Sequence, residues 1–210
     1  MRFGSRLLGS AVTAIGLGLF FVVSPAAADC NPDTALYADD FEFLDPSWGD
    51  PDNNLLVEDG ALVVKGGEGR VNFSTKNEGA NVCADVTIVE DPVPDSSAVG
   101  LVFWWQDWNN YYYFYYWANG SLEVRRVVNG KENVVFTTDT LALKKGVGQT
   151  NHIELVLKPK DATIFINGTE VKRFKGVQPK DGGVVGVTAA SPQDKPAKFT
   201  FNNFIVSPAE

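Results

Sequence analysis

The chain has 210 residues, of which 44% are hydrophobic and 12% aromatic, and its formal net charge at pH 7 is −8. A length in this range suits a single domain with a core of its own. The acidic balance, with no cluster of Lys or Arg, argues against nucleic acid and anionic membrane surfaces as partners.

Residues 1–28 have the features of a cleaved signal peptide. Arg2 and Arg6 give a positive start, an apolar stretch follows over residues 7–23, and an Ala-x-Ala sequence ends at Ala28. We therefore expect cleavage there and a periplasmic or extracellular domain comprising residues 29–210. A membrane anchor is the alternative, although the apolar stretch is short for a span. Without the two arginines, 16 basic residues face 26 acidic ones, a net charge of −10.

Cys30 and Cys83 are the two cysteines of the chain. An even count after a secretion signal predicts one disulfide, which would tie the N-terminus to a predicted strand over residues 81–89. Free thiols are the alternative. The cysteines and the single histidine, His152, are too far apart in the sequence to show the spacing of a zinc site.

Aspartates gather near the N-terminus of the mature chain, at positions 39, 40, 45, 50 and 52. Calcium prefers several hard oxygen ligands, so Asp39 and Asp40 are candidate ligands of a structural calcium ion. No EF-hand spacing is present, and ordinary solvated loop acids are the alternative. No other cofactor is expected.

No segment after residue 28 has convincing helical periodicity. Short strand-like runs recur instead, separated by turn signals, which is typical of a β-sandwich or a barrel. The predicted strands are residues 36–43, 55–57, 61–65, 70–74, 81–89, 98–106, 111–118, 121–128, 131–137, 152–158, 163–167, 169–174, 184–190 and 198–206.

Seven consecutive aromatic residues occupy positions 111–117, and four more lie just upstream: Phe103, Trp104, Trp105 and Trp108. Successive side chains of a strand point to opposite faces of the sheet. Such a run can fill a core with one row of rings and present a second row to solvent, where flat rings suit stacking against sugars. Burial of most rings between two sheets is the alternative.

Two Asn-Gly steps flank the predicted strand 121–128, and a third lies at residues 167–168. Asn-Gly favours a two-residue type I′ turn, which fixes the register of a hairpin. The first step then pairs Trp117 with Leu122 and Tyr115 with Val124.

The second Asn-Gly step, at residues 129–130, pairs Arg125 with Val134 and Val124 with Val135 in the same way. Arg126 falls on the apolar side of its strand, where a β-bulge or a position beyond the core would explain it.

These registers divide the aromatic run into two rows. Leu122 and Val124 look like core residues, which predicts that the odd-numbered rings of residues 111–117 are buried with them. The even-numbered rings then share a solvent-facing, concave sheet face with two charged residues. The predicted ligand-binding residues are Trp105, Tyr112, Phe114, Tyr116, Glu123 and Arg125.

Three stretches resemble the concanavalin A-like lectin/glucanase superfamily, especially its laminin-G-like and family 66 carbohydrate-binding relatives. They are Ala38-Asp39-Asp40-Phe41 with Trp48; Gly100-Leu101-Val102-Phe103-Trp104 with Asp107 and Asn110-Tyr111-Tyr112-Tyr113-Phe114; and Asn151-His152-Ile153-Glu154-Leu155 leading to Ile164-Phe165-Ile166-Asn167-Gly168, closed by Gly186-Val187 and Phe201-Asn202-Asn203-Phe204-Ile205-Val206.

The resemblance covers nearly all of the mature chain and implies an all-β fold, a jelly-roll sandwich of two antiparallel sheets. It also implies a calcium ion between the terminal strands, although Asn202 and Asn203 stand where relatives often have Asp. The superfamily includes binding modules, hydrolases and structural domains, so the likeness of fold does not carry an activity.

The sequence offers little for catalysis. The Glu-x-Asp-x-x-Glu strand of related glucanases is absent, and Glu123 has no carboxylate two positions away on its strand. His152 begins an alternating strand and is expected to be a partly exposed strand residue. We therefore expect a non-catalytic, lectin-like domain that binds a poly- or oligosaccharide. The alternatives are an enzyme resembling glycoside hydrolases or 3-keto-disaccharide hydrolases, and a structural or protein-interaction domain of the cell envelope.

Overall fold

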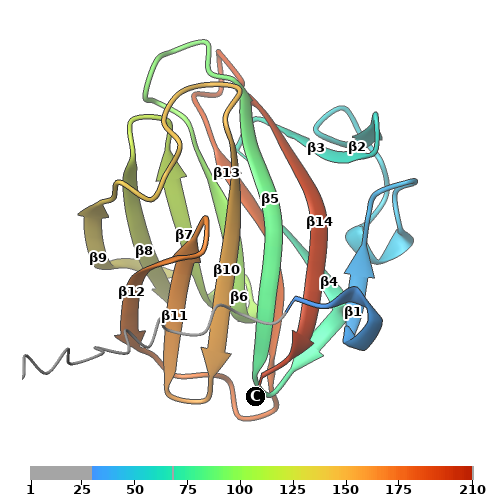
Figure 1. The fold of residues 1–210 in the computed structure, drawn as a ribbon, viewed down its shortest axis with the longest axis vertical. Helices are drawn as coiled ribbons and strands as arrows, with labels where there is room; N and C mark the ends of the chain where they lie inside the picture. Colours follow the sequence, from blue (N-terminus) through green and yellow to red (C-terminus); the bar gives the residue numbers. More distant parts are fainter. Residues whose placement is uncertain (1–29, 68, 210) are drawn as a thin grey trace, which may run out of the picture.

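Two antiparallel sheets lie face to face in the computed structural model, which describes residues 30–67 and 69–209 (Figure 1). The expected all-β jelly-roll sandwich is therefore confirmed. The predicted signal peptide lies outside the described residues. Among those residues, no helix is long and apolar enough to cross a membrane.

The larger sheet has eight strands in the order β12-β11-β10-β5-β14-β3-β2, with β1 paired to β14. In Figure 1 its strands β10, β5 and β14 lie in front of the second sheet. The bounds are β1 (Tyr37–Asp39), β2 (Leu55–Glu58), β3 (Ala61–Lys65), β5 (Ala80–Glu90), β10 (Thr150–Lys158), β11 (Asp161–Ile166), β12 (Thr169–Lys175) and β14 (Lys198–Pro208). Two short 3₁₀ turns, η1 (Pro32–Thr34) and η2 (Pro46–Trp48), precede β2.

The smaller sheet has six strands in the order β4-β13-β6-β7-β8-β9. Its central strand β7 contains the aromatic run and lies between β6 and β8. The bounds are β4 (Gly69–Asn77), β6 (Ala98–Asp107), β7 (Asn110–Trp117), β8 (Ser121–Val128), β9 (Lys131–Asp139) and β13 (Gly183–Ala190).

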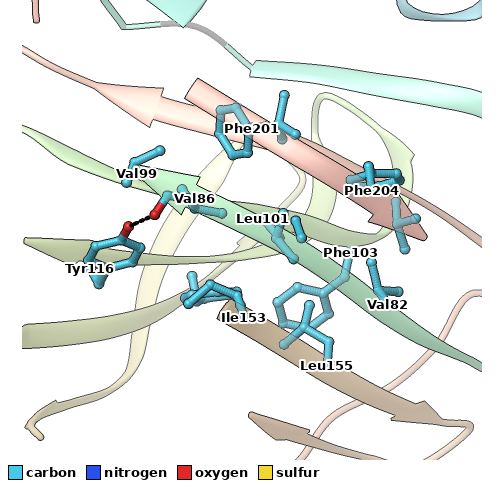
Figure 2. Packing of buried hydrophobic residues seen from close by; sticks show 14 of the residues in the cluster. Val82, Val86, Val99, Leu101, Phe103, Tyr116, Ile153, Leu155, Phe201 and Phe204 are labelled. Carbon is cyan, nitrogen blue, oxygen red and sulfur yellow. Dashed lines mark hydrogen bonds between the residues drawn. The ribbon is translucent and has the colours of Figure 1, made fainter. Parts of the chain in front are cut away.

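The core lies between the sheets and is built mainly from alternate residues of the strands. Figure 2 shows Leu101 and Phe103 of β6 packed against aliphatic residues of β5 and β10. Tyr116 crosses from β7 to the opposite sheet, where its hydroxyl donates a hydrogen bond of 2.9 Å to the Val86 carbonyl (Figure 2). The inward face of β7 is therefore fixed by both packing and a polar anchor.

The loop that joins β7 to β8 has three residues, 118–120, rather than the predicted two. A type I′ turn needs positive φ at both central residues, but here Gly120 has φ of 100° and Asn119 is not in the positive-φ region. The Gly120 N–H donates to the Trp117 carbonyl at 3.0 Å, and the Asn119 side chain accepts from the Ser121 N–H at 2.9 Å. The extra loop residue shifts the hairpin register by one position.

This shift reverses the predicted faces of the aromatic run. Tyr116 pairs with Leu122 and Phe114 pairs with Val124, so the even-numbered rings lie in the core. Tyr112, Phe114 and Tyr116 are 5%, 0% and 2% exposed. Their predicted position on the open face is wrong, because a one-residue slip moves every side chain of a strand to the other face.

The β8–β9 hairpin follows its prediction more closely. Asn129 and Gly130 both have positive φ, and Arg125 pairs with Val134 as expected. A bulge beyond Arg125 then pairs Val124 with Phe136 instead of Val135. Residues 125–128 of β8, next to the turn, therefore keep the predicted register. Residues 121–124 are displaced by one residue relative to β9.

A second irregularity positions the tryptophans of β6. Trp104 has φ of 49°, and the pairing with β7 shifts between Phe103 and Asp107. Phe103 and Trp104 consequently both point into the core, whereas Trp105 moves to the outer face. Gly176 leaves room for the Trp104 ring, since a Cβ there would lie 2.1 Å from it.

The predicted disulfide between Cys30 and Cys83 is present and closes a loop with a sequence separation of 53. In the chain-entropy treatment such a crosslink stabilises the fold by about 4 kcal/mol. It attaches the beginning of the described chain to β5 in the larger sheet.

The burial of the even-numbered rings can be tested with a matched pair of phenylalanines. Phe114→Ala should lower the free energy of unfolding by about 3–5 kcal/mol because it empties a fully buried site. Phe73→Ala, at a side chain that is 65% exposed, should lower it by about 1.5 kcal/mol or less, because it loses little buried area and one ring contact with Trp105. Urea unfolding followed by circular dichroism measures both. Equal, small losses would contradict the observed register.

Candidate functional site

The outer face of the six-stranded sheet contains a continuous row of seven aromatic rings, which we call the ring row. Consecutive members contact each other with centroid separations between 4.8 and 6.2 Å, mostly edge to face. Such contacts each add about 0.5–1.5 kcal/mol beyond buried area. In order, the ring row consists of Phe73, Trp105, Trp108, Tyr111, Tyr113, Tyr115 and Trp117.

Exposure varies along the ring row. Phe73 is 65% and Trp108 48% exposed, whereas Tyr113 in the middle is only 5% exposed. Tyr111 and Tyr115 are intermediate. The rings at the β4 side therefore offer the most open surface, and the central tyrosines are partly covered by their neighbours.

A groove of about 420 Å³ runs beside the tyrosines of the ring row. Tyr111, Tyr113 and Tyr115 line it on β7, and Thr188 of β13 lines it from the neighbouring part of the sheet. The Tyr115 hydroxyl lies 3.1 Å from Thr188 Oγ1, within hydrogen-bonding distance. The groove thus combines ring surfaces with hydroxyl groups that donate and accept hydrogen bonds.

A cluster of charged residues on β8 and β9 borders the groove. Arg125 donates to Glu123 through Nε and to Glu132 through Nη1, and the Tyr113 hydroxyl donates to Glu132. The Thr137 hydroxyl donates to Glu123 at 3.0 Å. The cluster is partly buried, since the Glu123 and Arg125 side chains are 12% and 32% exposed. Each charged group is therefore fixed by protein partners.

The environment of the ring row keeps its phenols protonated. Burial raises the pKa of Tyr113, and the hydrogen bond to Glu132 raises this pKa further. Burial also raises the pKa of Tyr115, while the contact with Thr188 acts in the opposite direction. For Tyr111, burial and the charge of Glu132 both raise the pKa. These hydroxyls remain available as hydrogen-bond donors at neutral and moderately alkaline pH.

The structure brings together three of the six predicted ligand-binding residues. Trp105 lies on the outer face in the ring row, and Glu123 and Arg125 lie on the same face beside Tyr113. Tyr112, Phe114 and Tyr116 do not join them because they fill the core. The odd-numbered rings, which the sequence assigned to the core, lie on the outer face instead.

Sequence reasoning missed the contributions of Phe73 and Trp108 to this face. Phe73 comes from β4, which is separated from β6 in the sheet by β13, although the Phe73 ring reaches Trp105. Trp108 lies in the tight turn between β6 and β7, outside both strands. Its neighbours in the aromatic run were the only signal that could have indicated its place.

Two carboxylates of the charged cluster, Glu123 and Glu132, bind the same guanidinium group, that of Arg125. Retaining glycoside hydrolysis needs two carboxyl groups about 5–5.5 Å apart, one of them protonated. Each of these carboxylates instead forms an ion pair with Arg125, and Glu132 also accepts a hydrogen bond from the Tyr113 hydroxyl.

His152 lies on the other sheet, far from the ring row in the fold. Its Nδ1 is 2.7 Å from Asp85 Oδ1, and the side chain is 40% exposed. Ile153, Leu155 and Leu157 of the same strand are fully buried, as the alternation predicted. The histidine is thus a partly exposed strand residue of β10.

The candidate calcium ligands lie near a hollow of about 480 Å³ beside β1. The Asp39 carboxylate accepts hydrogen bonds from Trp48 Nε1 at 2.8 Å, the Phe41 N–H at 2.8 Å and the Tyr37 hydroxyl at 2.9 Å. Asp40 accepts from the Glu42 N–H. Among the described residues, no group of three or more His, Cys, Asp or Glu side chains is close enough to hold a metal ion. Asp39 fits a structural role, in which it holds the turn that follows β1.

Comparison with known proteins identifies the fold. No protein-family profile and no curated protein matches the sequence. Among solved structures, the carbohydrate-binding module CBM66 from Bacillus subtilis is 16% identical, with a TM-score of 0.54 over 72% of this chain and 84% of that chain. A Bacillus licheniformis β-glucanase is 8% identical, with a TM-score of 0.63 over 81% and 97%. A κ-carrageenase from Zobellia galactanivorans is 9% identical, with a TM-score of 0.59 over 89% and 100%. The fold is therefore the concanavalin A-like jelly-roll sandwich, as the resemblance implied.

The raised tyrosine pKa values predict a loss of stability in alkali. Burial raises the pKa of Tyr116 above the ordinary value of 10.0, so the unfolded chain releases this proton at a lower pH than the folded chain. The stabilisation that the protonated Tyr116 gives the fold is therefore complete below about pH 10. Above that pH, the free energy of unfolding falls by about 1.4 kcal/mol per pH unit. Urea unfolding between pH 9 and 11.5 should show a shallower decline for Tyr116→Phe than for the native chain. Parallel curves would show that this tyrosine titrates normally.

Proposed function

We propose that residues 29–210 form a non-catalytic carbohydrate-binding domain that takes a poly- or oligosaccharide on the outer face of the six-stranded sheet. The observation that supports this function is the ring row beside a groove lined with hydroxyl groups. Sugars present apolar C–H faces and many hydroxyls, so they match a surface of flat rings with polar groups at its edge. The similar folds of a carbohydrate-binding module and of glycan-degrading enzymes agree with this assignment.

The ligand-binding residues in this proposal differ in part from those expected from the sequence. Trp105, Glu123 and Arg125 remain, and Tyr111 and Trp108 take the place of the buried even-numbered rings. Trp108 is the most exposed of the three tryptophans in the ring row, so it offers the largest open surface for stacking against a sugar. Arg125 is held by Glu123 and Glu132, and Glu123 is held by Arg125 and Thr137, so both side chains offer fixed hydrogen-bonding atoms rather than mobile ones.

We further propose a periplasmic or extracellular location. The segment before Ala28 has the pattern of a cleaved secretion signal, and the disulfide between Cys30 and Cys83 suits an oxidising compartment. Cleavage after Ala28 would leave the crosslinked Cys30 as the second residue of the mature chain.

Affinity electrophoresis through gels that contain laminarin, lichenan, xylan, galactan, mannan or levan tests the binding function. At least one neutral polysaccharide should retard the native chain. Trp108→Ala should weaken that retardation roughly tenfold or more, because an exposed aromatic anchor contributes above 1.4 kcal/mol. Phe43→Ala is the matched control, since Phe43 is 67% exposed but lies near β1.

Two outcomes would contradict the proposal. Unretarded migration in every gel would remove carbohydrate binding and favour a structural or protein-interaction domain. Release of reducing ends from the polysaccharide that retards the chain would instead support the enzyme alternative. We expect no such release, because the two nearby carboxylates share one guanidinium.

A further inference from the structure

Two grooves meet at Trp108 on the outer face of the six-stranded sheet. The first is the groove of about 420 Å³ lined by Tyr111, Tyr113 and Tyr115, which we call the tyrosine compartment. The second, of about 350 Å³, lies beside η2 and is lined by residues that include Trp48 and Phe73; we call it the η2 compartment. Both grooves are also lined by Gly69 and Trp108, so they are neighbours across one side chain.

Trp108 is held at this boundary by edge-to-face contacts with two neighbouring aromatic rings. Its ring meets Trp105 at 72° and Tyr111 at 84°, with centroid separations of 5.7 and 5.4 Å. Gly69 leaves the space beneath it open, because a Cβ at that position would lie 3.0 Å from the indole ring. Nearly half of the side chain, 48%, still meets solvent. The indole is thus a fixed, exposed ridge between two hollows.

The charges around the two compartments are unfavourable for an anionic ligand. Glu132 is the acidic side chain in the described lining of the tyrosine compartment, and the nearby Arg125 already binds two carboxylates. Arg70 lines the η2 compartment and forms an ion pair with Asp52 at 3.3 Å. A sulfated or carboxylated polymer would have to displace these carboxylates and would meet an acidic protein. A neutral chain pays neither cost.

We propose that a neutral glycan chain binds across both compartments, with successive sugars on either side of Trp108. This inference rests on the proposed carbohydrate-binding function and adds the length and the charge class of the ligand. A short fragment fills one compartment only. A longer chain gains the contacts of the second compartment without a second loss of rotational and translational freedom, so its affinity should rise with length.

Isothermal titration calorimetry with oligosaccharides of two to eight sugar units tests this inference. The oligosaccharides come from partial acid hydrolysis of the polysaccharide that retards the chain. The longest fragments should bind at least about tenfold more tightly than the disaccharide. Phe73→Ala reports on the η2 compartment, and Tyr111→Leu reports on the tyrosine compartment. Each variant should weaken binding of the longest fragments, and no more than one of them should weaken binding of the disaccharide.

The outcomes separate this inference from the function on which it rests. Affinity that is independent of length, or long-fragment binding that responds to only one variant, would overturn the two-compartment account while leaving carbohydrate binding intact. Stronger retardation by κ-carrageenan than by any neutral polysaccharide would overturn the charge class. Absence of retardation by every polysaccharide would overturn both proposals. If Tyr111→Leu fails to fold, Glu132→Gln reports on the same compartment, since Glu132 is 45% exposed.

Discussion

The three-residue loop between β7 and β8 determines which tyrosines reach the surface. Gly120 adopts φ of 100° at the end of this loop, and the added residue moves the whole of β8 by one position relative to β7. Leu122 and Val124 must face the core, so the even-numbered rings follow them inward. The odd-numbered rings then have only the outer face, and the ring row and the charged cluster follow from that single register.

The bulge at Trp104 completes the same surface from the other side. It turns two consecutive aromatic residues, Phe103 and Trp104, into the core and directs Trp105 outward. Without it, strict alternation would break the ring row between Trp108 and Phe73. The bulge in β6 and the three-residue β7–β8 loop, rather than the regular strands, therefore align the seven rings of the ring row. These rings come from β4, β6, β7 and the turn between β6 and β7. The resulting surface has rigid rings and fixed charges, which limits the entropy lost on binding.

Much of the architecture could be predicted from the sequence. Alternating patterns, Asn-Gly turns and the paired cysteines indicated the sandwich, the disulfide and the Arg125–Val134 register. The faces of β7 could not be predicted, because Asn119-Gly120 is compatible with loops of two or three residues. Phe73 was missed for a different reason: it reaches Trp105 through non-local pairing of β4 with β13, which no local pattern reports.

Hydroxyl-radical footprinting with mass spectrometry tests the central claim, that the odd-numbered face of the six-stranded sheet is the glycan-binding surface. Oxidation would be compared with and without the polysaccharide that retards the chain. The account predicts protection of Trp108 and Phe73, with unchanged oxidation of Leu141, which is 95% exposed outside both compartments. Protection confined to His152 on the larger sheet, or to Phe43 beside β1, would contradict it.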